Sequence, residues 1–188
     1  MKYLIGVLIL IVSAPPAANA GNKPMGSISD VAAFNKIRSY CIDSSDLSTS
    51  EANDVQAFIR TESKPKGLLV KLPWKLVADC AQGSPDAVAK LKFHLLNKVG
   101  MDVGNPATDP MSRMGLYNLR AWLGIYDSHS SELLYEVEAS PLDNPNPAPT
   151  GLPDQEPLPL LRRNATYRAF WMLIDDLRLT SKQSNGHN

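Results

Sequence analysis

The three histidines are the side chains of this sequence best suited to bind a metal or carry a proton near neutral pH. They are His94, His129 and His187, which fall on a predicted strand face, in a predicted turn and in a polar tail. A metal site would require these distant positions to converge in space. We therefore expect solvated histidines, and no metal or other cofactor.

The serine and aspartate pairs are the next candidates for chemistry. Ser44–Ser45 and Ser130–Ser131 lie in predicted turns without the strand-to-helix elbow that exposes a catalytic serine. Asp175–Asp176 lies in a predicted helix, where we expect a surface pair of charges rather than a catalytic dyad. We predict no catalytic residue, and a hydrolase site remains the least favoured reading.

The two cysteines, Cys41 and Cys80, could form a nucleophile, a metal site or a disulfide. Catalysis would need a base nearby, and a metal would need further ligands at close spacing. Neither is visible in the sequence. In an exported protein such a pair indicates a disulfide, which would stabilise the fold by roughly 3–4 kcal/mol.

Residues 1–20 have the three-part pattern of a secretory signal peptide. A positive start at Met1-Lys2 precedes an apolar run from Tyr3 to Val12, and Ala18-Asn19-Ala20 offers a cleavage site before Gly21. The run is shorter than the roughly 20 residues that span a bilayer, and no cysteine stands at the cleavage site for lipid attachment. We expect a secreted, soluble protein without a stable membrane anchor, periplasmic in a Gram-negative bacterium.

The charge of the mature chain argues against two classes of partner. Of 19 basic residues one, Lys2, lies in the signal peptide, which leaves a net charge near −1 against 19 acidic residues. Nucleic acids and anionic membranes favour strongly basic proteins. A protein partner in the cell envelope is the favoured alternative.

Two segments have helical periodicity. Residues 49–62 place an apolar stripe from Ala52 to Ile59, with Thr49 or Ser50 as the cap. Residues 160–180 form a second stripe that contains Phe170. These are the two main helices.

Alternating polar and apolar residues predict three strands. Residues 87–95 alternate with a period of two, although a helix through Val88 and Leu91 is an open alternative. Residues 119–125 and 133–139 alternate on either side of the polar segment 127–131, which predicts an antiparallel hairpin with a long turn.

Two further apolar runs, Ile37 to Ile42 and Trp74 to Cys80, flank the first helix. This order predicts two parallel strands joined by a helical crossover, with both cysteines near the same end. Strands about 4.8 Å apart suit the roughly 4.4–6.8 Å Cα separation of a disulfide. We predict an α+β fold with a mixed four- to five-stranded sheet. The alternative is an all-α bundle linked by the disulfide.

Short motifs in this order resemble exported bacterial domains of the TolB amino-terminal type and the core of the curli-secretion lipoproteins. The motifs are Tyr40-Cys41-Ile42-Asp43-Ser44-Ser45, Asp86-Ala87-Val88 and Leu134-Tyr135-Glu136, within a resemblance that covers about residues 34–140 and the last helix. The resemblance implies an architecture and an envelope setting. The proline-rich segment and the missing lipidated cysteine depart from the lipoprotein members.

The rest of the chain divides around a proline-rich connection. Residues 21–140 form the predicted core, 141–159 the proline-rich connection, 160–180 a helix on the same domain, and 181–188 a disordered tail. The connection is either a surface link or a polyproline arm that docks on a partner. Asn164 begins a glycosylation pattern, but it lies inside the predicted helix.

Aromatic residues supply the remaining functional hypothesis. Trp74, Trp122 and Trp171 are expected in or beside the core, but Trp122 lies opposite the apolar face of its strand, near Tyr126. Exposed together, Trp122 and Tyr126 would form a binding surface. We predict a non-enzymatic protein-interaction role in the cell envelope, with a small-ligand or glycan-binding module as the alternative.

Overall fold

The structure, a computed structural model, describes residues 23–98, 117–141 and 157–185. The predicted signal peptide and most of the proline-rich connection lie outside these residues. The described elements, in chain order, are β1 (Ser27–Ile28), α1 (Val31–Lys36), β2 (Ser39–Asp43), α2 (Thr49–Glu62), the 3₁₀ turn η1 (Leu69–Lys71), β3 (Lys75–Leu76), β4 (Ala87–Lys98), β5 (Tyr117–Asp127), β6 (Leu133–Ala139) and α4 (Pro157–Asn185).

The strands form one mixed sheet of six strands in the order β1-β6-β5-β4-β2-β3. β2 runs parallel to β3 and β4, whereas β4, β5, β6 and β1 pair antiparallel. The predicted α+β class is confirmed, and the all-α alternative is wrong. The sheet has more strands than predicted, because β1 is two residues long and too short to show a period of two.

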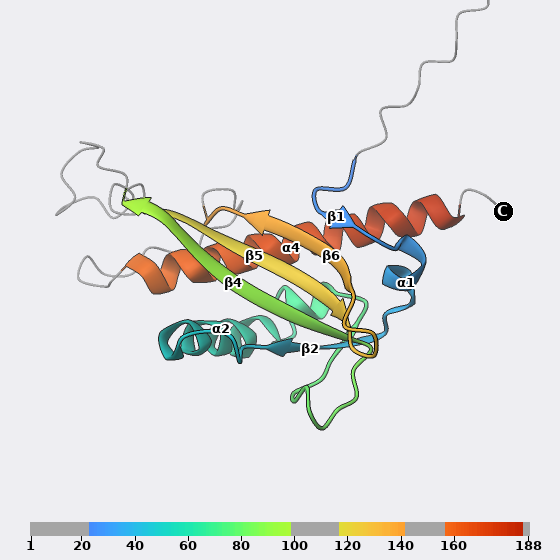
Figure 1. Cartoon of the computed structure of the whole chain (residues 1–188), viewed down its shortest axis with the longest axis horizontal. Helices are drawn as coiled ribbons and strands as arrows, with labels where there is room; N and C mark the ends of the chain where they lie inside the picture. Colours follow the sequence, from blue (N-terminus) through green and yellow to red (C-terminus); the bar gives the residue numbers. More distant parts are fainter. Residues whose placement is uncertain (1–22, 99–116, 142–156, 186–188) are drawn as a thin grey trace, which may run out of the picture.

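The helices cover one face of this sheet, and α4 runs along it behind β5 and β6 (Figure 1). The core between the layers contains apolar side chains from all three helices and from the inward-facing positions of the strands. Its largest fully buried members include Phe34, Phe58, Phe170 and Leu173 from the helices and Tyr40, Leu91, Leu123, Ile125 and Tyr135 from the sheet. The opposite face of the sheet is left free of described helices.

The predicted parallel pair and its disulfide are confirmed. β2 and β3 flank α2 in the sequence and pair in parallel, and Cys41 is bonded to Cys80 with a Cα–Cα distance of 5.3 Å. The second strand is shorter than the predicted run from Trp74 to Cys80, since β3 ends at Leu76. Cys80 therefore lies in the turn that follows β3 rather than on the strand.

The predicted strand 87–95 and the hairpin are also confirmed, as β4, β5 and β6. The polar turn between β5 and β6 is closed by Asp127, whose carboxylate accepts hydrogen bonds from the N–H groups of His129 and Ser130, both at 2.8 Å. Ser131 has a positive φ of 60°, the left-handed conformation that lets the chain reverse.

Both predicted helices form, with different ends. Ser48, rather than Thr49 or Ser50, caps α2 in a capping box. Its hydroxyl accepts from the backbone N–H of Glu51, and the Glu51 carboxylate accepts from the backbone N–H of Ser48. α4 begins at Pro157, where proline fits the first helical turn, so it takes in the end of the predicted connection. It continues through Asn185, into the tail that we expected to be disordered.

Asp176 corrects the prediction of a surface pair on α4. Its side chain is fully buried, and it accepts hydrogen bonds from the N–H groups of Met25 and Gly26, both at 2.8 Å, and from the Tyr135 hydroxyl at 3.0 Å. Burial and this neighbouring carboxylate raise the pKa of Tyr135, so its hydroxyl stays protonated and donates. Asp176 thus ties the segment that leads into β1 to both layers of the fold.

Candidate functional site

The face of the sheet opposite the helices, which we call the outer face, presents the strand positions that alternate with the core. No described helix packs on it. Its residues are Val88, Lys90, Lys92 and His94 from β4, Arg120, Trp122, Gly124 and Tyr126 from β5, and Glu136 and Glu138 from β6.

Trp122 and Tyr126, the two aromatic residues predicted as a binding surface, are neighbours on this face. Their ring centroids are 6.3 Å apart with the planes tilted by 59°, and both side chains are half-buried. The indole of Trp122 lies over Gly124, where an added Cβ would stand 2.2 Å from the ring. Glycine at position 124 is therefore what allows the indole to lie along the sheet.

Polar groups hold the indole in this position. Its Nε1–H donates to the Glu136 carboxylate at 3.1 Å, and the Lys92 Nζ lies 5.1 Å from the ring centroid, within the range of a cation–π contact. Two fixed partners reduce the freedom that the ring would lose on binding. A preorganised aromatic side chain is a good anchor for a ligand or protein partner.

Charge is distributed unevenly across the outer face. Basic side chains lie on β4 and β5, and the acidic side chains lie on β6. The Glu138 carboxylate accepts a hydrogen bond from Arg120 at 3.2 Å and lies 3.6 Å from His94 Nδ1, so both side chains share this one acidic neighbour. Lys92 forms no ion pair with any residue that the structure describes, so positive charge remains toward β4.

A hollow of about 350 Å³ lies on the same face beside the disulfide. Tyr126, Val88 and Cys80 give it an apolar part, and Asp43, Asp46, Lys90, Lys92, Asp127, Ser128 and Ser131 give it a polar rim. Trp122 is not among its lining residues. Of the two aromatic residues predicted as a binding surface, Tyr126 therefore borders this hollow and Trp122 does not line it.

The charged groups at this hollow are paired with one another. Lys90 Nζ lies 3.3 Å from the Asp46 carboxylate and 3.4 Å from the Asp43 carboxylate. The hydrogen bond to Asp46 and the negative charges of both aspartates raise the pKa of Lys90. Burial opposes ionisation of Asp43, but hydrogen bonds from Ser45 and the charge of Lys90 outweigh it and lower the pKa of Asp43. These shifts keep Asp43 and Lys90 charged at neutral pH.

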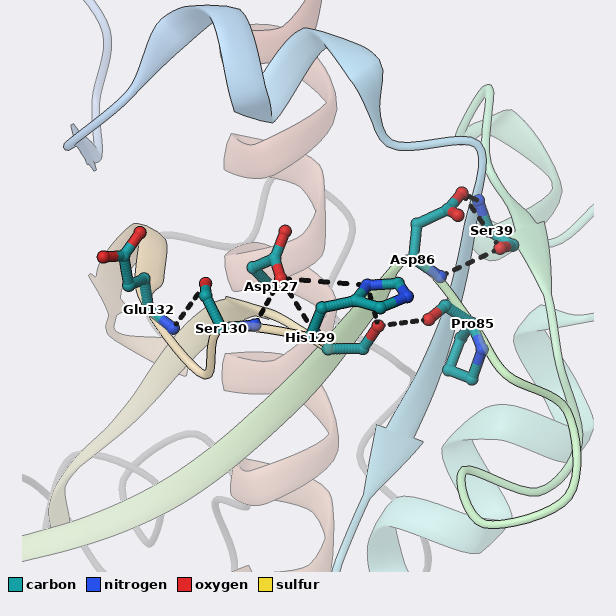
Figure 2. Close-up of polar contacts among 8 residues, drawn as sticks. Ser39, Pro85, Asp86, Asp127, His129, Ser130 and Glu132 are labelled. Atoms are coloured by element: carbon teal, nitrogen blue, oxygen red, sulfur yellow. Dashed lines mark hydrogen bonds and ion pairs between the residues drawn. The ribbon is translucent and has the colours of Figure 1, made fainter.

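Two further carboxylates fasten the end of the sheet that borders the hollow (Figure 2). The Asp86 carboxylate accepts from the N–H groups of Arg38 and Ser39, both at 2.8 Å, and these bonds lower its pKa. The N–H groups of Ser130 and His129 likewise lower the pKa of Asp127. Asp86 thus stabilises the start of β2, and Asp127 stabilises the turn between β5 and β6.

Ser128, His129 and Asp127 bring together the residue types of a hydrolytic triad, but both neighbours of the histidine contact the same ring nitrogen. Ser128 Oγ lies 3.2 Å from His129 Nδ1. The Asp127 carboxylate lies 3.9 Å from the same nitrogen (Figure 2). A triad needs the nucleophile and the acid on opposite ring nitrogens. The Ser128 hydroxyl also donates to the Pro85 carbonyl, so it is engaged in holding the turn.

The other residues considered from the sequence are dispersed. His94 and His129 lie near opposite ends of β5, and His187 lies outside the described residues. Within the described ranges, no group of three or more His, Cys, Asp or Glu side chains is placed to hold a metal. Asn164 is 1% exposed, so the folded chain does not present it for glycosylation.

Sequence reasoning identified the aromatic pair but missed the residues that position it. Gly124, Glu136 and Lys92 act on Trp122 through cross-strand pairing, which depends on register. The alternation of the three strands was visible, but the polar turn joins β5 to β6 and gives no register for β4. The register shift between Ile125 and Tyr126 also breaks a count outward from that turn toward Glu136.

No family model, curated protein or solved structure matches this chain. In the parts of the chain that the structure describes, no helix has the length and apolar character needed to cross a bilayer.

Proposed function

We propose that this chain is an exported, non-enzymatic domain that acts through protein–protein contact in the cell envelope, and that the outer face of the sheet is its contact surface. The observation that carries the proposal is the Trp122–Tyr126 pair on a sheet face without a helical cover. Tryptophan, tyrosine and arginine dominate the energy of protein interfaces, and Arg120 lies on the same face.

The engagement of the polar groups favours binding over catalysis. Asp86 and Asp127 accept from backbone N–H groups, Lys90 is held by two aspartates, and the Ser128 hydroxyl donates to a carbonyl. A general base or nucleophile would have to give up such a structural bond to react.

Export is supported by the signal-like pattern of residues 1–20 and by the Cys41–Cys80 disulfide, which is stable in an oxidising compartment. The resemblance to TolB-type and curli-secretion domains agrees with this setting. Amino-terminal sequencing of the protein from its native host tests export directly. We expect the mature chain to begin at Gly21, and an intact Met1 would contradict it.

Affinity capture with oxidised residues 21–188 tests the contact surface. Wild-type protein should recover a reproducible envelope partner after crosslinking, and the double variant Trp122→Ala/Tyr126→Ala should lose most of it. The matched control is Val31→Ala/Val70→Ala, which removes two exposed apolar side chains that lie outside the outer face. Equal recovery by both double variants would reject the outer face as the contact surface.

A small-ligand or glycan-binding function is a second candidate, favoured by the hollow of about 350 Å³ next to Tyr126. Sugar rings stack on flat, fixed aromatic side chains, and Trp122 lies beside the hollow with its indole held by Glu136. Titration with oligosaccharides, followed by tryptophan fluorescence, tests this reading. A response that survives both Tyr126→Ala and Trp122→Ala would exclude it.

A further inference from the structure

The edge of β4 is paired along only part of its length. β2 pairs with β4 from Tyr40↔Ala87 to Asp43↔Lys90, and then the chain turns away into α2. β5 accompanies β4 on its other side as far as Lys98↔Tyr117. Among the described residues, no strand pairs with β4 beyond Lys90 on the side of β2 (Figure 1).

The backbone groups on this free edge can be assigned from their neighbours. Tyr40 O accepts from Val77 N of the β3 segment, so Cys41 directs its backbone groups toward β4. The partners on β4 are then Ala87 and Ala89, and Asp86 O, which accepts from Ser128 N, points the other way. By the same alternation Asp43 bonds to Ala89 and Leu91, so the N–H of Leu91 is still paired with β2. The free edge therefore begins at the C=O of Leu91 and continues with the N–H and C=O groups of Phe93 and Leu95.

Unpaired edges of this kind accept extended peptides as additional strands. Main-chain hydrogen bonds supply the affinity, and side chains beside the edge select the sequence. The inward-facing side chains along the edge are Leu91, Phe93 and Leu95. Leu95 is 51% exposed, which is unusual for a leucine on the covered face of a sheet. Apolar residues of an added strand would cover it.

The outward-facing side chains along the same edge are basic. Lys92 and His94 are exposed and alternate with the apolar positions. Lys92 is without an ion pair among the described residues, and His94 shares Glu138 with Arg120. Acidic residues of an added strand would therefore lie next to Lys92, whose positive charge has no ion pair among the described residues.

A second copy of this chain fits the edge less well. Pairing two β4 edges antiparallel about a two-fold axis would place Lys92 and His94 beside the same residues of the other copy. Like charges on neighbouring strands are destabilising, so the basic edge disfavours pairing with itself.

We propose that the free edge of β4, from Leu91 to Leu95, binds an extended segment of a partner protein in which acidic and apolar residues alternate. This inference rests on the proposed protein-interaction function and names the chemistry of the partner. The bound segment lies as a further strand beside β4, with its acidic side chains next to Lys92 and His94.

Binding of a fluorescein-labelled peptide of alternating glutamate and valine to oxidised residues 21–188 tests the proposal. Fluorescence anisotropy should rise to saturation, and a peptide of alternating lysine and valine should not bind. Lys92→Glu should weaken the glutamate peptide about five-fold or more and admit the lysine peptide, because it turns a cross-strand attraction into a repulsion. Lys64→Glu, which makes the same charge change at an exposed position after α2, should leave both results unchanged.

A backbone variant separates edge pairing from charge attraction. Leu95→Pro removes an edge N–H while leaving the ladder to β5 intact, so it should abolish binding with an unchanged circular dichroism spectrum. Hydrogen exchange at the amides of Phe93 and Leu95 should slow when the glutamate peptide binds, which reports pairing without any substitution.

Three results would overturn the inference. They are no saturable binding of the glutamate peptide, equal binding by wild type and Lys92→Glu, or unchanged exchange at the edge amides. A dimer in sedimentation velocity that Leu95→Pro dissociates would assign the edge to a second copy and also reject the proposed partner. Partner capture that depends on Trp122 and Tyr126 is measured independently, so the proposed function can stand while this inference fails.

Discussion

Replacement of Asp176 by alanine tests the least expected feature of the fold, a buried carboxylate that joins three segments. The carboxylate accepts three hydrogen bonds, from Met25 N, Gly26 N and the Tyr135 hydroxyl. Hydrogen bonds to a charged group contribute about 1.5–3 kcal/mol each. Their simple sum overestimates the loss, because Asp176→Ala also removes the cost of burying a charge.

The contributions of the three donors differ in a way that sets the expected magnitude. The Tyr135 side chain is fully buried, so its hydroxyl would lose its partner without gaining water. The amides of Met25 and Gly26 are only part-buried and can regain water if the segment before β1 detaches. We expect Asp176→Ala to lower the free energy of unfolding by about 3 kcal/mol, and to speed hydrogen exchange from Gly26 to Ile28.

Urea denaturation of oxidised residues 21–188, followed by tryptophan fluorescence, measures this loss. The neighbouring Asp175 is a matched control, since its ion pair with Arg178 at 3.1 Å lies at the surface. Asp175→Ala should cost less than about 0.5 kcal/mol. The reasoning is refuted if the two alanine variants have the same stability, or if exchange near β1 is unaltered in Asp176→Ala.

Three further predictions concern the rest of the fold. Cys41→Ala/Cys80→Ala should lower the free energy of unfolding by about 4 kcal/mol in urea melts, because the disulfide closes a loop with a sequence separation of 39 residues. A loss below about 1 kcal/mol would contradict this prediction. Tyr40→Phe should raise stability by about 1 kcal/mol in the same assay, because the buried Tyr40 hydroxyl has no hydrogen-bond partner among the described residues, and a destabilised variant would reveal a missed partner. The free energy of unfolding should stay level from neutral pH to about pH 5 and fall below about pH 4. The reason is that the pKa values of Asp86 and Asp127 are lower in the folded state than in the unfolded chain, so acid protonates the unfolded chain first. Thermal melts of Asp86→Asn should show a smaller loss of stability in acid than wild type, and an equal loss would contradict the assignment.

Local periodicity was sufficient to predict most of the elements of this fold. The period of two in residues 87–95 and around the polar turn marks β4, β5 and β6, because each strand has one covered and one open face. The parallel pairing of β2 with β3 followed from a pair of cysteines on either side of a helix. These features depend on neighbours in the sequence or on a covalent link, both of which can be read directly.

Features that depend on distant partners could not be predicted in the same way. β1 and α1 are too short to show periodicity, and β1 forms because β6 offers it an edge. Asp176 looks like an ordinary helix-surface charge until Tyr135 and Gly26 are placed beside it. The candidate surface shows the same division. The alternation within β5 was enough to predict that Trp122 lies on the outer face. Its contacts with Lys92 and Glu136 depend on how the neighbouring strands are aligned, which the sequence does not show.

Site-specific photo-crosslinking in the native envelope tests the central claim, that the outer face of the sheet is the contact surface, most directly. Benzoylphenylalanine would replace Tyr126 on the outer face or, in a control, the exposed Arg60 of α2. We predict a discrete crosslinked partner from position 126 and none from position 60. A partner captured only from position 60, or equally from both positions, would contradict the account.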